Sequence, residues 1–389
     1  MTTLSEAPSG SRTWDRNTAA GRWYGLGRWY AMFPAAFARD AVLALSRAGE
    51  TVLDPFCGRG NAPFAATVFG RSSIGIDIHP LAWLWTGAKL HPEPSVDRLL
   101  DRLGEVVRAT RKADRRARTR FERMAWAPEV RAFLRAARRE LDWQESITDR
   151  TLMAFVALHA QDKIGAGLSN QLSPTVAYSP SYAVDWWTRK GFLDPPAVDP
   201  TSFLTDRIMR RYKHGIPEMA SGTALLGDAR ELLRTASPLG ASLLITSPPY
   251  RGVTDYWNDH WIRLWLLGYD FRKDWKRSAR HTGKDEYRAL LAAVFREARR
   301  HLTRGAAVLV RCDQRKETAT ICAEALADAW PRRRIFVRAT EAPYDGVSAE
   351  HGRGGSKARE LDLLLPGNRG RRWTSNCGFR PGRDLLSLA

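Results

Sequence analysis

The stretch from residue 51 to residue 78 constrains the fold more than any other part of this 389-residue chain. TVLDPF (51–56) is a short apolar strand, CGRG (57–60) is a glycine loop, NAPFAATVF (61–69) is a helix that closes at Gly70, and SSIGIDI (72–78) is a second strand. Strand, glycine loop, helix and strand in this order are typical of a βαβ unit. The sequence therefore predicts an α/β fold with a doubly wound sheet.

Five more apolar runs extend the predicted sheet to seven strands: TALLGDA (223–229), ASLLITSPPY (241–250), AAVLVRCD (306–313), RIFVRAT (334–340) and ELDLLLP (360–366). The last two are expected to close as a hairpin. An amphipathic helix is expected over 37–49, with Gly49 at its end. Together these patterns predict four segments: a flexible N-terminus at 1–20, an α/β domain formed by 21–90 and 222–366, a mainly helical insert at 91–221, and a basic tail at 367–389.

The chain is strongly basic, and the insert contains a dense basic run, RKADRRARTR (111–120). Lys and Arg number 61 against 42 Asp and Glu, so the formal net charge is +19 and the pI is near 10.3. A surplus of this size attracts polyanions, and nucleic acid is the first partner to consider. The alternative is an ordinary basic helical surface. If the insert binds DNA, the candidate phosphate contacts are Arg111, Lys112, Arg115, Arg116, Arg118 and Arg120.

A segment of the insert with amide and aromatic side chains is the candidate for base reading. It includes Asn170, Gln171 and Tyr178. Amide side chains can pair bidentately with adenine in the major groove, whereas phosphate contacts carry no sequence information. We therefore expect Gln171 to influence which sequences are bound.

Three acids each stand at the end of a predicted strand. Asp54 opens the glycine loop, Asp77 ends the next strand, and Asp228 ends the strand at 223–229. Open α/β sheets bind ligands outside the carboxyl ends of their strands, where an acid can reach ribose hydroxyls. Gly58 and Gly60 let the backbone approach a ligand closely. A cap or turn role is the alternative for a single acid, but three such positions predict a nucleotide-like pocket.

The sequence Ser247-Pro248-Pro249-Tyr250 directly follows the apolar strand SLLIT. Two prolines remove two amide donors and stiffen the backbone, which leaves carbonyl oxygens available as acceptors beside an aromatic ring. This combination suits a planar base with an exocyclic amino group. A structural turn is the alternative.

Together, DPFCGRG, the Asp77 of GIDI, the GDA at 227–229 and SPPY resemble the S-adenosylmethionine-dependent amino-methyltransferases of DNA. That family methylates N4 of cytosine or N6 of adenine, and the resemblance covers about 21–90 and 222–366. It implies a seven-stranded, Rossmann-like methyltransferase sheet. A large insert between the second and third strands departs from this pattern, and its assignment as target-recognition region is a hypothesis.

The resemblance also implies residue roles. It assigns catalysis to the tetrad Ser247 through Tyr250 and assigns Asp77 to the ribose and Asp228 to the adenine of S-adenosylmethionine. The stretch from Tyr30 to Pro34 resembles a further cofactor-side motif. A serine in the first tetrad position favours cytosine N4. The residues expected around the methionine part of the cofactor are Asp54, Pro55, Phe56, Gly58 and Gly60.

The expected reaction needs alignment more than activation, because the sulfonium already activates the methyl group. A base inside a duplex is out of reach and must be flipped into the pocket. Cytosine C5 chemistry would need a nucleophilic cysteine, and no Pro-Cys dipeptide occurs. The alternatives are adenine N6 methylation of DNA, N2 methylation of guanosine in tRNA, and a non-catalytic nucleic-acid-binding protein.

Other classes of protein fit the sequence poorly. The four cysteines share no CxxC spacing, the eight histidines form no ligand cluster, and neither HExxH nor GxSxG occurs, so we expect no metal. We also expect neither a signal peptide nor a membrane span. These features predict a cytoplasmic, nucleoid-associated enzyme whose substrate is double-stranded DNA. A cognate restriction enzyme or another defence-system protein is a candidate partner.

Overall fold

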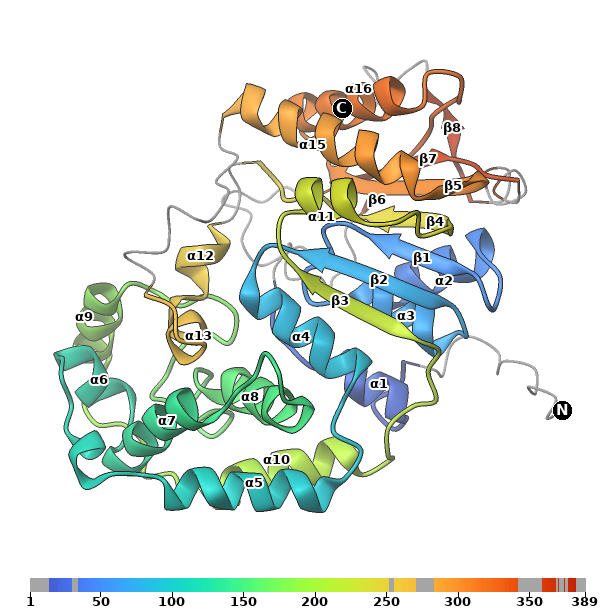
Figure 1. Ribbon diagram of the computed structural model, residues 1–389. Helices are drawn as coiled ribbons and strands as arrows, with labels where there is room; N and C mark the ends of the chain where they lie inside the picture. Colours follow the sequence, from blue (N-terminus) through green and yellow to red (C-terminus); the bar gives the residue numbers. More distant parts are fainter. Residues whose placement is uncertain are drawn as a thin grey trace, which may run out of the picture.

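The computed structural model describes residues 14–29, 34–251, 255–270, 283–341, 359–368, 370, 374 and 377–382. Figure 1 shows a sheet flanked by helices and, beside it, a second body built of helices. We call residues 96–212, which contribute α5 to α10 between β2 and β3, the helical region. The remaining described residues up to 90 and from 222 are the sheet region, although α12 and α13 of that part pack against the helical region.

The described residues contain one sheet, in the order β3-β2-β1-β4-β5-β7-β6-β8. Neighbouring strands from β3 to β5 are parallel, whereas β7 runs antiparallel between β5 and β6. The order reverses between β1 and β4, which is where open α/β sheets bind ligands. The strands are β1 (Thr51–Asp54), β2 (Ser72–Asp77), β3 (Gly222–Leu226), β4 (Ala241–Thr246), β5 (Leu302–Asp313), β6 (Phe336–Glu341), β7 (Arg359–Leu365) and β8 (Arg380–Pro381).

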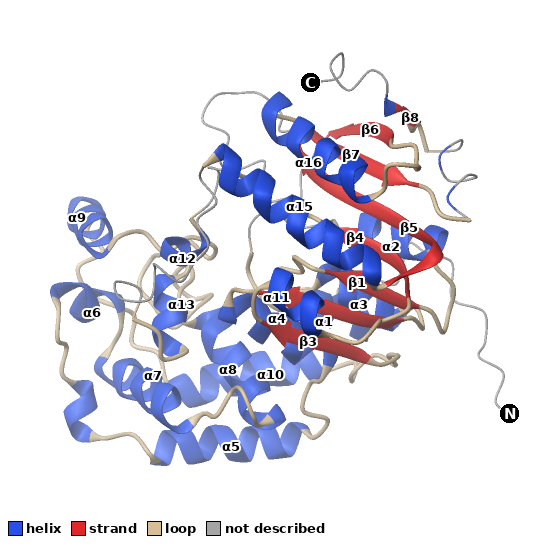
Figure 2. Cartoon of the chain, turned by 45° about the horizontal axis from the view of Figure 1, so that its top comes forward, coloured by secondary structure: helices blue, strands red, loops and turns tan. Residues whose placement is uncertain are grey.

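Helices account for most of the remaining described chain (Figure 2). In the sheet region they are α1 (Ala19–Tyr24), α2 (Ala35–Leu45), α3 (Asn61–Val68), α4 (Pro80–Leu90), α11 (Ala229–Thr235), α12 (Tyr256–Asp259), α13 (Trp261–Leu266), α15 (Lys284–Arg300) and α16 (Lys316–Ala329). In the helical region they are α5 (Val96–Arg108), the 3-10 turn η1 (Lys112–Arg115), α6 (Arg120–Ala125), α7 (Pro128–Glu140), α8 (Ile147–His159), α9 (Pro180–Lys190) and α10 (Pro200–Tyr212).

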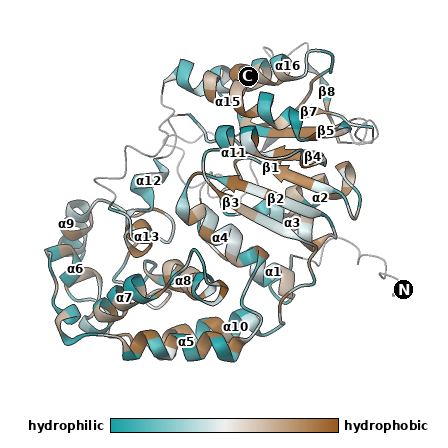
Figure 3. Ribbon diagram, in the orientation of Figure 1, coloured by the Kyte–Doolittle hydropathy of each residue, from teal (hydrophilic) through white to brown (hydrophobic). Residues whose placement is uncertain are grey.

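Alternating side chains on the central strands fill two cores. Leu243 and Ile245 of β4 face α2 and α3, while Leu244 faces α11 and α15 on the other side. Figure 3 shows apolar colour concentrated on β1 and β4. A third core joins α4 to the helical region and includes Trp85 and Trp187, both fully buried. Burial of this much apolar surface is the main stabilising term in a fold of this kind.

The α/β fold and all seven predicted strands are confirmed, and the last two form the expected antiparallel pair. A two-residue eighth strand, β8, was not predicted. The helix expected to end at Gly49 ends at Leu45, because Ser46 adopts an extended conformation and Gly49 belongs to the turn before β1. Trp257, Trp261 and Trp265 recur at helical spacing but belong to two short helices, because His260 lies between α12 and α13.

Candidate active site

Asp54 connects the ends of the two central strands. It is 1% exposed, and its Oδ1 accepts hydrogen bonds from the Phe56 amide at 3.1 Å and from the Thr246 hydroxyl at 2.7 Å. Thr246 ends β4 directly before the tetrad, so this bond joins the glycine loop to the tetrad. Burial raises the pKa of Asp54 to about 7, and the nearby charge of Asp77 acts in the same direction.

Asp77 connects β2 to the same loop. Its Oδ2 accepts from the Gly58 amide at 2.8 Å, and its Oδ1 accepts from the His79 amide at 2.9 Å. The side chain is half-buried, and burial raises its pKa to about 6. The apolar side chain of Ile78, next in sequence, is 43% exposed. An acid and an exposed apolar group therefore stand together at the end of β2.

The glycines of the loop adopt left-handed backbone conformations, with φ of +53° at Gly58 and +76° at Gly60. Their neighbours are protein side chains. A Cβ on Gly58 would lie 2.9 Å from Nε1 of Trp29, and one on Gly60 would lie 2.6 Å from the Thr86 hydroxyl oxygen. Close packing inside the chain thus requires glycine at both positions, in addition to any approach of a ligand.

Trp29 carries an aromatic cluster that sequence reasoning missed. Its ring stacks on Tyr256 at a centroid distance of 5.1 Å and on His260 at 4.9 Å. His79 packs edge-on against Trp29 at 5.1 Å, and burial lowers the pKa of His79 to about 3, so its imidazole is neutral. Because Tyr256 and His260 follow the tetrad, this cluster joins the post-tetrad segment to the glycine loop. Only the aromatic richness of GRWYGLGRWY hinted at it.

Asp228 differs from the other two acids. It caps α11 by accepting from the Arg230 amide at 2.8 Å, and its carboxylate also binds the Arg230 guanidinium, with Nε 3.0 Å from each oxygen. Its negative charge is therefore already matched. No cation is among the groups that shift the pKa of Asp54 or Asp77.

The tetrad lies at the carboxyl end of β4, beside Asp54. Pro248 and Tyr250 are buried, whereas Ser247 and Pro249 are half-buried. The Tyr250 hydroxyl donates to Oε1 of Glu360 at 3.0 Å, and a side-chain hydrogen bond also links Tyr250 to Ser247. Sequence reasoning missed Glu360, because it lies 110 residues away on β7.

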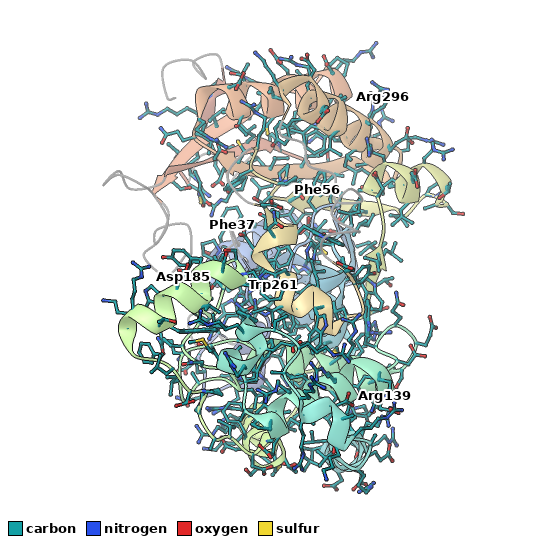
Figure 4. All side chains as sticks on the ribbon, turned by 90° about the vertical axis from the view of Figure 1, so that its left-hand side faces the viewer. Phe37, Phe56, Arg139, Asp185, Trp261 and Arg296 are labelled. Atoms are coloured by element: carbon teal, nitrogen blue, oxygen red, sulfur yellow. The ribbon has the colours of Figure 1, made fainter. Side chains whose placement is uncertain are left out.

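Figure 4 views the molecule from the side at which these strands end. It places Phe56, which follows Asp54 and Pro55, between the helices above and the helical region below, with Trp261 of α13 beneath it. Pro55 is buried and Phe56 is half-buried. The structure therefore brings together the glycine loop, Asp77 and the tetrad. Most of the stretch from Tyr30 to Pro34 lies outside the described residues.

The predicted basic run lies elsewhere. In Figure 1 the chain between α5 and α6 forms the lower left corner of the helical region, away from the sheet. Arg115 pairs with Glu129 at 3.6 Å, a surface contact. The structure exposes all six predicted cations, namely Arg111, Lys112, Arg115, Arg116, Arg118 and Arg120.

Arginines of α7 hold the backbone of this run in place. Arg131 donates to the Arg115 carbonyl oxygen at 2.9 Å, and Arg135 donates to the Arg116 carbonyl oxygen at 2.8 Å. Arg131 and Arg135 are each less than 9% exposed. The run is therefore a fixed platform whose own side chains point outward.

The predicted base-reading segment divides in two. Asn170 is fully buried, and its amide donates to the carbonyl oxygens of Met124 and Phe192, both at 2.9 Å, so it serves the packing of the helical region. Gln171 is half-buried and accepts from the Ile164 amide at 3.1 Å. Tyr178 is 42% exposed, and its carbonyl oxygen accepts from the Trp261 indole. This segment therefore contacts the helices that follow the tetrad.

The residues at this edge suit S-adenosylmethionine. Burial raises the pKa of Asp54 and of Asp77, and no cation in the described part of the chain counters that rise. A ligand that carries a sulfonium and an ammonium group would supply one. No group of three His, Cys, Asp or Glu side chains in the described ranges could hold a metal ion. No helix of the described residues is long and apolar enough to cross a membrane.

Comparison with known proteins gives one family match. The model of the N6_N4_Mtase family, described as DNA methylase, matches residues 8–82, which include the glycine loop and Asp77 and end before the tetrad. The Type II methyltransferase M.SmaI of Serratia marcescens is 43% identical over 53 residues, which is 14% of this chain and 18% of that protein. These findings confirm the resemblance to the S-adenosylmethionine-dependent DNA amino-methyltransferases, with S-adenosylmethionine as the cofactor that it implies.

Two solved structures align with most of the chain at low similarity. TrmN from Thermus thermophilus is 13% identical with a TM-score of 0.32, over 92% of this chain and 53% of TrmN. The rRNA methyltransferase aviRa from Streptomyces viridochromogenes is 12% identical with the same TM-score, over 92% of this chain and 89% of its own.

Proposed function

We propose that this protein is a site-specific DNA methyltransferase that transfers the methyl group of S-adenosylmethionine to the N4 amino group of a flipped cytosine. The observation that carries the proposal is the hydrogen bond between Asp54 and Thr246, which holds the glycine loop against the start of the tetrad. Cofactor and target base would therefore meet at the switch point between β1 and β4.

Asp54 and Asp77 are the residues that would hold the cofactor. Asp77, which the Gly58 amide holds in place, would be the acid that binds the ribose, and Ile78 offers an apolar surface beside it. Asp54 would face the methionine part. When bound, the cofactor supplies an electrophilic methyl group on positively charged sulfur.

Ser247 and the Pro248 carbonyl would align the base. The lone pair of the cytosine amino nitrogen is delocalised into the ring, so the amine is a weak nucleophile. If these two acceptors take its N–H groups, the nitrogen becomes more pyramidal and its lone pair points away from the ring. Correct orientation of this kind can supply a large part of a barrier reduction.

The decisive test is transfer of tritium from labelled S-adenosylmethionine to duplex DNA, followed by nucleoside analysis of the product. We expect N4-methylcytosine. N6-methyladenine would retain a DNA amino-methyltransferase and overturn the cytosine assignment, while transfer to tRNA alone would overturn DNA as the substrate.

A variant pair separates the roles of the two motifs. Tyr250→Ala should retain cofactor affinity while methyl transfer falls by orders of magnitude, because base stacking contributes about 1–3 kcal/mol and also orients the base. Asp54→Ala should lose cofactor binding itself, as measured by calorimetry. If the activity of Tyr250→Ala fell only in proportion to its cofactor affinity, the tetrad would not form the base pocket.

The helical region is the proposed DNA-binding part. Replacing Arg115, Arg116 and Arg118 together by Ala should weaken binding to all duplexes alike. Each cation that no longer meets a phosphate should reduce the log–log salt slope by about one. Because α7 holds the backbone of this run, the substitutions should leave its position unchanged. An unchanged slope across a salt series would show that the run faces solvent and that DNA binds elsewhere.

Gln171 is the proposed contributor to sequence preference. Gln171→Ala should change which sequences are methylated, but it also removes the acceptor of the Ile164 amide. Gln171→Glu is the matched control. It keeps an acceptor oxygen for the Ile164 amide but replaces the side-chain NH2 donor by a second carboxylate oxygen. A methylation profile across random duplexes that matched the wild type in both variants would exclude Gln171 from base reading.

A further inference from the structure

A buried network of charges lies behind Tyr250, at the end of the sheet where β5, β7 and β6 are neighbours. Arg311 of β5 binds the carboxylate of Asp362 on β7 through Nε at 2.7 Å and Nη2 at 3.0 Å, and Arg338 of β6 binds the same carboxylate at 2.7 Å. Arg311 also lies 3.1 Å from Oε2 of Glu360. Two cations and two carboxylates thus balance one another.

Glu360 is the member of this network that reaches the tetrad. It is 4% exposed, and Oε1 accepts the Tyr250 hydroxyl while Oε2 pairs with Arg311. Burial raises the pKa of Glu360, and the Arg311 charge and the Tyr250 hydrogen bond counter that rise. Both carboxylate oxygens of Glu360 therefore have a partner: Oε2 pairs with Arg311 of β5, and Oε1 accepts from Tyr250 of the tetrad.

The Tyr250 ring cannot turn freely in this setting. Its side chain is 7% exposed, and its hydroxyl oxygen is held at 3.0 Å from a carboxylate that Arg311 fixes in turn. Hydrogen bonds to charged acceptors are about twice as strong as neutral ones. The direction of the ring's long axis is therefore held from its hydroxyl end by β7, a strand that forms no part of the tetrad, together with the side-chain hydrogen bond to Ser247.

We propose that Glu360 is a positioning residue for methyl transfer: through the Tyr250 hydroxyl it sets the orientation of the ring against the target base. This inference rests on the proposed function, because it assumes that Tyr250 contacts the base. Glu360 does not touch the substrate in this account, and it exchanges no proton with it.

A double-mutant cycle tests the proposal. Tyr250→Phe removes only the hydroxyl. Glu360→Gln keeps the side-chain size, but its amide oxygen should turn to Arg311, so that the hydroxyl meets an N–H donor in place of its charged acceptor. Each single variant should lower kcat by about tenfold to a hundredfold, with KM for S-adenosylmethionine within twofold of the wild type. The double variant should be no slower than the slower single variant, because both remove one interaction.

Arg338→Met is the matched control. It removes a cation from the far end of the same network and should lower the unfolding temperature without changing the kcat of the folded enzyme by more than twofold. If the effects of Tyr250→Phe and Glu360→Gln multiplied, or if either left kcat unchanged, the positioning role would be overturned. A wild-type enzyme that methylated no DNA would instead overturn the proposed function, so the two failures are distinguishable.

Discussion

Two kinds of buried charge differ in how the protein satisfies them: Asp54 and Asp77 at the carboxyl edge of the sheet, and the arginines Arg131 and Arg263 in the helical region and in α13 packed on it. Asp54 and Asp77 accept only from amide and hydroxyl groups, so their negative charge is not neutralised. Arg131 and Arg263 donate to main-chain carbonyl oxygens, so the hydrogen-bond donors of these two arginines are used inside the protein. The carboxylates are thus left available for a ligand, and the arginines serve the packing.

This difference limits what net charge can say about DNA binding. The +19 of the chain includes buried arginines such as Arg131, Arg135 and Arg263, which cannot reach a phosphate. The field they create still extends outward, but the contacts themselves must come from exposed residues such as those of the 111–120 run. Composition therefore predicts attraction to a polyanion and not the place of contact.

The largest expected effect is on stability, from Arg263→Met. Arg263 is fully buried and donates to the carbonyl oxygens of Ala157 at 3.0 Å, Thr175 at 3.3 Å and Pro174 at 2.6 Å. Leaving three buried acceptors unsatisfied should cost about 3–5 kcal/mol of unfolding free energy, measured by denaturant titration.

The control for this prediction is Arg98→Met. Arg98 is 67% exposed and pairs with Glu93 at 3.3 Å, so its loss should change stability by less than about 1 kcal/mol. Equal effects of the two substitutions would contradict the view that the buried arginines hold the helical region and α13 together.

The next effect is on cofactor affinity, from Asp54→Asn. Both hydrogen bonds to Asp54 end on Oδ1, so the amide can keep them while losing the charge. Affinity for S-adenosylmethionine should fall about a hundredfold, because the cationic ligand loses a carboxylate. Calorimetry would measure it.

The same variant should not destabilise the free protein. The pKa of Asp54 is raised to about 7 on folding, so the folded state holds this proton more tightly than the unfolded chain. The contribution of Asp54 to the free energy of unfolding therefore falls as pH rises from about 4 to about 7. Asn carries no such penalty, and its unfolding temperature at about pH 8 should equal or exceed that of the wild type. A marked loss would assign Asp54 a structural role.

The third prediction concerns the pH dependence of the affinity for S-adenosylmethionine. With pKa values of about 7 for Asp54 and about 6 for Asp77, both carboxyls are ionised at alkaline pH and protonated in acid. A bound cation favours the ionised forms, so affinity for S-adenosylmethionine should fall by about tenfold per protonated carboxyl between pH 8 and pH 5.5. Asp54→Asn should lose the part of this dependence near pH 7. A flat profile in the wild type would show that neither acid faces the cofactor.

The smallest expected effect comes from Arg230→Met. Arg230 is 41% exposed and neutralises Asp228, the rim acid that already has a cation. Its removal should change stability by less than about 1 kcal/mol, because partly exposed ion pairs contribute little. Freed from Arg230, Asp228 should bind the adenine amino group slightly better, with affinity rising less than about fivefold. A large loss of affinity would show that Arg230 itself binds the cofactor.

Local patterns predicted much of this molecule. The alternation and punctuation of residues 51–78 identify β1, α3 and β2, and Asp54 and Asp77 end their strands as expected. Asp228 lies two residues beyond the end of β3, where it caps α11. These features depend on neighbours in sequence, which a reader of the chain can see. The position of Ser247 through Tyr250 follows from the apolar run of β4 in the same manner.

The contacts that complete the site depend on distant parts of the chain. Thr246 reaches Asp54 across 192 residues, and Glu360 reaches Tyr250 across 110. Trp29 is fixed by its packing on Gly58, which no local pattern reveals. The burial of Asn170 was also hidden, because its amide is satisfied by carbonyl oxygens on two other segments of the helical region.

The two ends of the tetrad are attached to different parts of the molecule, one to the sheet and one to helices that pack on the helical region. On one side it continues β4, and on the other the chain enters α12 and α13, which Trp261 and Arg263 fasten to Tyr178 and to residues 174–175 of the helical region. If a bound duplex displaced the helical region, one end of the tetrad would move with it while the sheet held the other end in place. The DNA sequence would then affect the rate of methyl transfer as well as binding. A duplex bound in the wrong position would leave the amino group of the base misaligned with the methyl group of the cofactor.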